Sequence, residues 1–358
     1  MTLKTVATND AAGSAARINQ SHGEGIRGKL MALNFSVLPG KRRTISPTIV
    51  LFGLLCAAVF PLVLRQTNQT SLLLFSIYFV WLTLAQSWNL MGGYAGLLNL
   101  GLVSFFALGA TVSGASMHAG LSLAPSILLG GLAGALFAVA LIPTFRLRSD
   151  YFAIATLVIP VLMKPLVEFF IGTDFLVPSA DITSAIDQYY IGLAITGFSI
   201  FGIYLLMRSK VGYALKAIGE DELASSSLGV NILLFKSIAL VVGGFVASIA
   251  GSYFLEYIGS INSTIFLNLT YSLFPIFMVI IGGIGTFEGP ILGALIFSVV
   301  NYSTENYFSG STYDVLLFSV VIMIVAVLIP RGIAPSARAL TKRITSRHST
   351  KAVISQTA

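Results

Sequence analysis

Residues that could carry out bond chemistry are few in this 358-residue chain and lie far apart in its sequence. The three histidines are His22, His118 and His348, and Cys56 is the single cysteine. A metal centre needs several grouped ligands, and a nucleophile needs a base beside it. The spacing therefore predicts neither a metal site nor a catalytic set, and an enzyme embedded in a membrane has little support.

The stretch Gly-Glu-Gly-Ile-Arg-Gly-Lys-Leu at 23–30 differs by one residue from the loop that binds nucleotide phosphates. That loop ends in Ser or Thr, whose hydroxyl holds magnesium, and Leu30 stands in this place. The residues around it show no sustained apolar period. The sequence therefore predicts that the chain has no ATPase activity and binds no cofactor of its own.

The composition is that of a membrane protein. Hydrophobic residues make up 56% of the chain and charged residues 10%, whereas soluble domains average about 25% charged residues. The net charge of +7 arises in two basic tails, because residues 1–48 hold seven Lys/Arg and residues 331–358 hold six. The middle of the chain is net acidic, so the sequence predicts no nucleic-acid partner. The tails are expected either to contact lipid headgroups or only to set the topology.

Ten apolar stretches are long enough to span a bilayer. They lie at about 47–64, 70–91, 96–117, 123–145, 151–171, 189–207, 236–258, 269–285, 289–307 and 313–329. With both termini cytoplasmic, eighteen Lys/Arg fall on the cytoplasmic side and only Arg65 outside, as the positive-inside rule requires. The Gly, Ser and Asn content of 96–117 leaves open a broken or re-entrant helix there.

The predicted fold class is thus all-α, a polytopic transmembrane bundle of about ten helices. Residues 1–46 are expected to form a disordered basic cytoplasmic tail, and residues 336–358 a second basic cytoplasmic tail. The transmembrane domain occupies 47–335 and contains one long cytoplasmic loop at 208–235.

Polar residues inside the apolar segments are costly, so each one is informative. Lys164 and Glu168 are four residues apart and share one helix face, where they could pair or line a polar path. Asn89 and Asn99 flank a glycine turn and could either line a path or join helices by hydrogen bonds.

The 208–235 loop carries the most informative polar pattern. Its apolar and small residues predict two short amphipathic helices, broken near Gly219 and the acids Glu220–Glu222, with Gly229 as a stop. Helices of this kind can dock in the cleft of a partner or simply lie at the membrane interface.

Several stretches, taken in order, resemble the permeases of branched-chain amino acid type ABC importers. They are the loop from Gly212 to Gly229, Trp88–Gly96 through Phe105–Gly109, Leu147–Thr156, Gly282–Pro290 with Gly293, and Pro330–Gly332. The resemblance covers roughly residues 70–335, and its specificity lies in the order and spacing of the pieces. It implies an integral membrane subunit of a binding-protein-dependent importer in the bacterial plasma (inner) membrane.

The resemblance of the loop implies one set of functional residues, and the polar and glycine residues of the apolar segments predict a second. Coupling to an ATPase is expected from Gly212, Ala214, Ala217, Glu220, Asp221, Glu222, Ala224 and Gly229. A pathway or gating role is expected for Asn89, Gly92, Gly93, Gly96, Asn99, Lys164, Glu168, Gly282, Gly283, Gly285 and Gly289. The implied partners are cytoplasmic ATPase subunits that bind the ATP, a second permease or a second copy, an extracytoplasmic solute-binding protein, and membrane lipid.

The predicted function is translocation of a small solute, such as a branched-chain or related amino acid or an amide. The chain departs from the family at Leu102, where a histidine is usual, at Val161, where an acid is usual, and at Gly172-Thr-Asp-Phe, where two glycines are usual. The alternative is an ion-driven secondary transporter, with Lys164, Glu168 and Glu256 as its relay.

Overall fold

The computed structural model describes residues 69–147, 149–171, 174–176, 184–308, 320 and 332–336. The segments expected at 47–64 and 313–329 lie outside these residues, apart from residue 320. Both expected tails also lie outside them, apart from residue 336. The count of ten helices and the cytoplasmic position of both termini therefore stay predictions.

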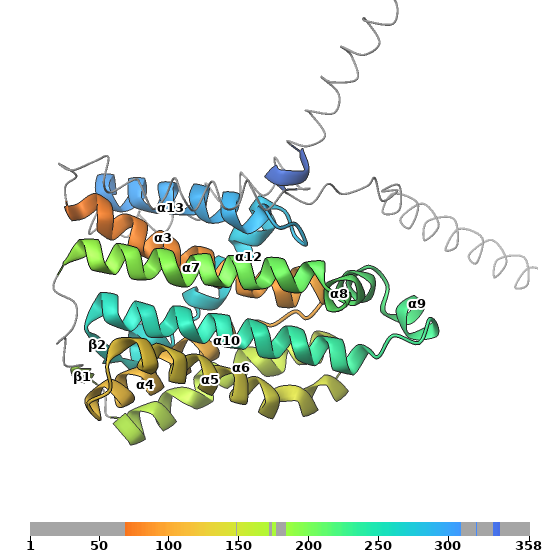
Figure 1. Cartoon of the computed structure of the whole chain (residues 1–358), viewed down its shortest axis with the longest axis horizontal. Coiled ribbons are helices and arrows are strands. Elements are labelled where there is room, and N and C mark those ends of the chain that lie inside the picture. The colour runs from red at the N-terminus through yellow and green to blue at the C-terminus, as the bar shows by residue number, and fades with distance from the viewer. Residues whose placement is uncertain are drawn as a thin grey trace, which may run out of the picture. The chain divides into compact units, whose positions relative to one another are not determined.

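The described part is nearly all helical (Figure 1). Its long helices are α3 (Gln69–Trp88), α4 (Leu102–His118), α5 (Leu123–Leu141), α6 (Ser149–Ile171), α7 (Ala185–Arg208), α10 (Ile232–Ile258), α12 (Thr270–Gly282) and α13 (Gly289–Phe308). The short ones are a π-helix η1 (Asn89–Tyr94), a 3-10 helix η2 (Ile142–Arg146), α8 (Lys210–Glu220), α9 (Glu222–Ser227) and α11 (Ser263–Phe266). Helices are thus confirmed at the expected segments between 70 and 307, with shifted ends.

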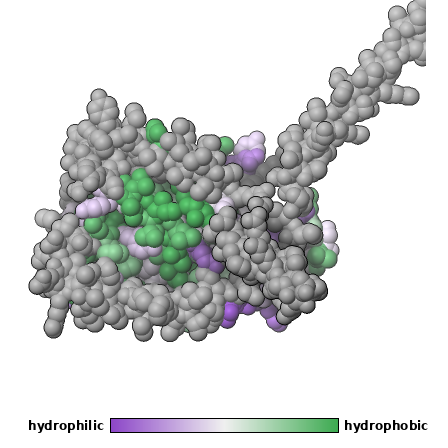
Figure 2. Space-filling view, turned by 90° about the horizontal axis from the view of Figure 1, so that it is seen from above, coloured by the Kyte–Doolittle hydropathy of each residue, from purple (hydrophilic) through white to green (hydrophobic). Residues whose placement is uncertain are grey.

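Five helical stretches are long and apolar enough to cross a membrane. They are Leu123–Arg146, Asp150–Phe169, Ala185–Arg208, Ile232–Ile258 and Ser263–Gly282. Their outer surfaces are apolar as well, and Figure 2 shows hydrophobic described residues gathered in the middle of the face that it views. Such surfaces suit a hydrocarbon environment.

Helix α10 lies at the centre and packs against α3, α4, α5 and α7 (Figure 1). Small residues let these helices approach closely. Ser248 Oγ donates to the Phe105 carbonyl at 2.7 Å, and Ser252 Oγ donates to the Gly109 carbonyl at 3.0 Å. A side chain at Gly134 of α5 would collide with Ser248. Serine and glycine thus take the place of bulky side chains in this contact.

One element of β structure corrects the all-α expectation. Strand β1 (Asp174–Leu176) pairs antiparallel with β2 (Ser260–Asn262), with Asp174 opposite Asn262. The ladder joins the segment after α6 to the segment after α10. Each strand has only three residues, and its partner is more than eighty residues away. No local sequence pattern therefore predicts the ladder.

The segment expected to be helical from 96 onward begins differently. Helix α3 continues as the π-helix η1 to Tyr94, residues 95–101 are not helical, and α4 begins at Leu102. Gly96 adopts a φ of +67°, which ends the helical path. The broken entry that the Gly and Asn content left open is therefore present. Single π turns inside helices occur often at functional sites.

Candidate functional site

The two short helices of the 208–235 loop stand at one end of the bundle (Figure 1). Helix α8 buries Leu215 and Ile218. The chain breaks at Asp221, whose Oδ1 accepts from the backbone N–H of Ala224 at 2.9 Å and so caps α9. The expected break beside the acid cluster is therefore confirmed.

The outward side of these helices carries three large apolar residues among small and acidic ones. Tyr213, Leu223 and Leu228 are 69%, 82% and 85% exposed. Beside them Glu220 is exposed and makes no ion pair or hydrogen bond within the described residues. We call Tyr213, Glu220, Leu223 and Leu228 the coupling surface. Large exposed apolar side chains next to a charge are typical of a surface that binds another protein.

The structure leaves most of the expected coupling residues exposed, and their coupling role stays a prediction. Six are exposed, namely Ala217, Glu220, Asp221, Glu222, Ala224 and Gly229. Ala214 is half-buried, and Gly212 is buried, where a side chain would collide with the Met207 backbone. Gly229 has a φ of +82° and nothing within 4 Å of an added Cβ, so the turn needs its backbone freedom rather than its small size.

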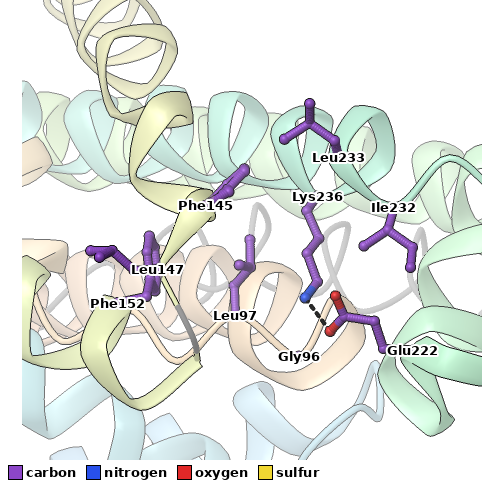
Figure 3. Close-up of a pocket in the computed structure, with 9 residues that line it drawn as sticks. All are labelled: Gly96, Leu97, Phe145, Leu147, Phe152, Glu222, Ile232, Leu233 and Lys236. Atoms are coloured by element: carbon purple, nitrogen blue, oxygen red, sulfur yellow. Dashed lines mark hydrogen bonds and ion pairs between the residues drawn. The ribbon is translucent and has the colours of Figure 1, made fainter.

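Glu222 differs from its expected role as an outward contact. Its Oε2 accepts from Lys236 Nζ at 2.6 Å, as Figure 3 shows, and ties the start of α9 to α10. The pair borders a cavity of about 350 Å³ whose other side is formed by Leu97, Phe145 and Phe152. Lys236 is 13% exposed and Glu222 52%. The charge of Glu222 is thus engaged within the chain.

A charge swap tests this assignment. Glu222→Lys alone places two cations together and should loosen α9, which lowers uptake by the assembled transporter. Glu222→Lys with Lys236→Glu again places opposite charges together and removes the repulsion, so we expect it to recover most of the uptake. Uptake assayed in membrane vesicles checks this. A double variant as defective as the single one would assign Glu222 to an external partner instead.

Helix α8 contacts the turn at residues 92–96, which we call the first glycine turn. A side chain at Gly219 would collide with the Tyr94 carbonyl, and the Gly219 Cα lies 3.7 Å from the Cβ position of Gly96. Lys216 Nζ lies 6.0 Å from the centroid of the Tyr94 ring, within cation–π range. The backbones of the two elements are therefore in direct contact.

The same glycine turn is joined to the turn between α12 and α13. Asn89 Nδ2 donates to the Thr286 carbonyl at 2.9 Å, and Asn89 Oδ1 accepts from the Gly285 N–H at 3.0 Å. An added Cβ on Gly93 would lie 2.8 Å from the Gly285 nitrogen. We call the two bonds of Asn89 the Asn89 clamp. Asn89 is fully buried, and its two partners in the turn are partly buried.

The α12–α13 turn is held in one conformation. Gly283 and Gly285 have φ values of +124° and +65°. Thr286 Oγ1 donates to the Gly283 carbonyl at 2.7 Å and accepts from the Gly289 N–H at 3.1 Å. An unbroken series of contacts therefore leads from α8 through η1 to this turn.

Other expected pathway residues serve this packing. Asn99 Oδ1 accepts from the Gly101 N–H at 2.9 Å and so caps the non-helical segment. A side chain at Gly92 would meet the Trp88 ring, and one at Gly282 would collide with the Gly289 backbone. The geometry places these residues near the clamp or the turn, and their gating role stays a prediction.

Lys164 and Glu168 lie elsewhere, on α6, which packs on α4 and α11. The pairing that their spacing allowed is absent from the part of the chain that the structure describes. Glu168 Oε1 instead accepts from Ser263 Oγ at 2.6 Å. The tertiary neighbour on α11 is thus preferred to the residue one turn away.

Sequence reasoning missed three polar residues that hold these elements together. Gln86 Nε2 donates to the Phe287 carbonyl at 3.2 Å, Thr156 Oγ1 accepts from the Leu100 N–H at 3.1 Å, and Thr286 fixes its own turn. The signal was available for Gln86 and Thr156, because a polar residue in an apolar helix needs a partner.

These features define a multi-pass membrane protein whose 208–235 loop exposes large apolar and acidic side chains. Residues 70–327 match the model of the family described as branched-chain amino acid transport system / permease component. The match covers well over half of the chain, which belongs to this family of ABC transporter permeases. No solved structure matches the chain.

Individual relatives agree with the family. The high-affinity branched-chain amino acid transport system permease protein LivM of Salmonella typhimurium is 28% identical over 293 residues, 72% of this chain and 68% of LivM. The permease LivH of the same organism is 32% identical over 107 residues, 30% of this chain and 33% of LivH. A nucleoside ABC transporter permease, NupC of Lactococcus lactis, is 23% identical over 46% of this chain and 60% of its own length.

Proposed function

We propose that the chain is the permease subunit of an ABC importer that moves a small solute across the bacterial plasma membrane. The observation that carries this is the exposed coupling surface on α8 and α9, in backbone contact with the turn at Tyr94–Gly96. A branched-chain or related amino acid, or an amide, is the proposed solute. The names of LivM and LivH support it, and the name of NupC shows that relatives differ in substrate.

The energy comes from separate ATPase subunits that bind the ATP, and this chain itself binds no cofactor and performs no bond chemistry. The coupling surface fits a cleft with an apolar floor for Leu223 and Leu228 and a basic group for Glu220. Closure of the ATPase pair would push α8 against the first glycine turn, and the Asn89 clamp would pass the movement to α12 and α13.

The pathway requires a second permease. The two relatives LivM and LivH carry one system name in one organism, which supports a pair of different permeases over two copies of this chain. An extracytoplasmic solute-binding protein delivers the solute, and the basic tails contact lipid headgroups.

The rival proposal is an ion-driven transporter that works alone. If the energy source is another polypeptide, the chain purified and reconstituted alone should accumulate no solute under a proton or sodium gradient. Uptake should appear only when the partner permease, the ATPase, internal ATP and the binding protein are supplied. Radiolabelled L-leucine, L-alanine and an aliphatic amide are the solutes to test in proteoliposomes. Gradient-driven accumulation by the isolated chain would overturn the proposal.

A further inference from the structure

Helix α6 presents a broad outer face without a partner in the described residues. Its inner face buries Phe152, Thr156 and Val167 against the rest of the bundle. Its outer face carries apolar residues that are 45–63% exposed. They are Ile154, Val158, Val161, Leu162 and Leu166. An apolar face could simply contact lipid. Two polar features at this part of α6 are costly in lipid.

The first feature is a cation. Lys164 is half-buried and makes no ion pair or hydrogen bond within the described residues, because Glu168 is bound to Ser263. It stands fifteen residues after Ser149 and seven before Ile171, so the nearer end of the helix is about 10 Å away at about 1.5 Å per residue. The helix is about 34 Å long and a hydrocarbon core about 30 Å thick, so a centred α6 places the Lys164 backbone inside the core. Unpaired charges at such depth face a polar cavity rather than lipid.

The second feature is a backbone carbonyl. Proline has no N–H, so Pro165 cannot donate the helical hydrogen bond to the carbonyl of Val161. Val161 is 63% exposed, and Pro165 is exposed as well. Hydrocarbon offers no replacement donor for a carbonyl, whereas water or a polar solute does. The freed carbonyl and the lysine are three residues apart, at neighbouring positions on the helix surface.

We propose that the α6 face from Val161 to Pro165 borders an aqueous path and that Lys164 binds the anionic group, a carboxylate, of the passing solute. Val161, three residues before Lys164 and so beside it on the helix surface, gives the aliphatic part of the solute an apolar contact. The inference rests on the proposed importer function, because it assigns a position in the path. It names the residue that contacts the charged group of the solute.

Thiol labelling tests the site without any solute or ATP hydrolysis. Cys56 is the single cysteine, so Cys56→Ser gives a thiol-free background. Val161→Cys in the full chain, assembled in membranes, should react with water-soluble methanethiosulfonate reagents, since only a hydrated thiol ionises. Leu136→Cys is the control, because Leu136 is 72% exposed on α5, which carries no charged residue. We expect the control to stay unlabelled.

The charge of the reagent then reports on Lys164. With each rate normalised to that of a free thiol, the anionic sulfonate reagent should label Val161→Cys about tenfold faster than the cationic ammonium reagent, as a single charge at about 6 Å in water predicts. Lys164→Gln should remove this preference, and Lys164→Arg should keep it. Two results would overturn the site: a Val161→Cys as unreactive as the control, or a preference that survives Lys164→Gln. Neither depends on which subunit supplies the energy, so failure here is distinct from failure of the importer proposal.

Discussion

Gly219→Leu is expected to lower uptake and solute-stimulated ATP hydrolysis by the assembled transporter about 5- to 150-fold, while the permease still inserts and assembles. Any side chain at Gly219 would collide with the Tyr94 carbonyl, so α8 would be lifted off the first glycine turn. Overpacking of a contact costs about 1–3 kcal/mol. If this free energy is lost from the coupling between the ATPase and the permease, the coupling weakens by a factor of about 5 to 150.

A matched glycine separates this contact from a general effect of substitution. Gly202 lies on α7, and an added Cβ there meets nothing within 4 Å. Gly202→Leu should therefore transport as the unmodified protein does. Transport and ATPase assays in proteoliposomes, with the amount of assembled complex measured beside them, give the comparison. If Gly219→Leu and Gly202→Leu behave alike, the α8 contact does not carry the coupling.

The local features of the site were predictable from the sequence because they depend on residues near one another in the chain. The acid cluster after Gly219 marks the break between α8 and α9, since Asp221 can cap a helix that begins beside it. The glycines of the first turn and of 282–289 indicate close backbone contacts in the same way. The sequence could not indicate that Gly93 meets Gly285, because nearly two hundred residues separate them.

The errors share one physical cause, which is competition from partners distant in the sequence. Spacing on one helix allowed Lys164 to pair with Glu168, but Glu168 instead accepts a hydrogen bond from Ser263 on α11. Glu222 was expected to contact a partner protein, but it forms an ion pair with Lys236 of α10. The non-helical entry to α4, which the Gly and Asn content left open, is stabilised by one distant partner, Thr156, whose Oγ1 accepts from the Leu100 N–H.

Asn89→Leu should break the second link in the same series of contacts. Leucine has nearly the shape of asparagine but neither of its hydrogen bonds, so the partly buried Thr286 carbonyl and Gly285 N–H would lose these partners. The two lost bonds together cost about 1–3 kcal/mol. We expect uptake to fall by about tenfold, since about 1.4 kcal/mol corresponds to that factor. Asn89→Asp should also fail, because a carboxylate cannot donate to Thr286.

Loss of stability alone could also reduce uptake, so the control removes a comparable bond elsewhere. Thr83 is buried on α3, and its Oγ1 lies 3.0 Å from the Thr196 Oγ1 of α7, outside the series from α8 to α13. Thr83→Val should lower the melting temperature without uncoupling ATP hydrolysis from the solute. Asn89→Leu should retain ATP hydrolysis that no longer responds to the solute, because the ATPase still binds the coupling surface while the movement stops at η1. A solute response preserved in Asn89→Leu would show that α12 and α13 receive the movement by another route.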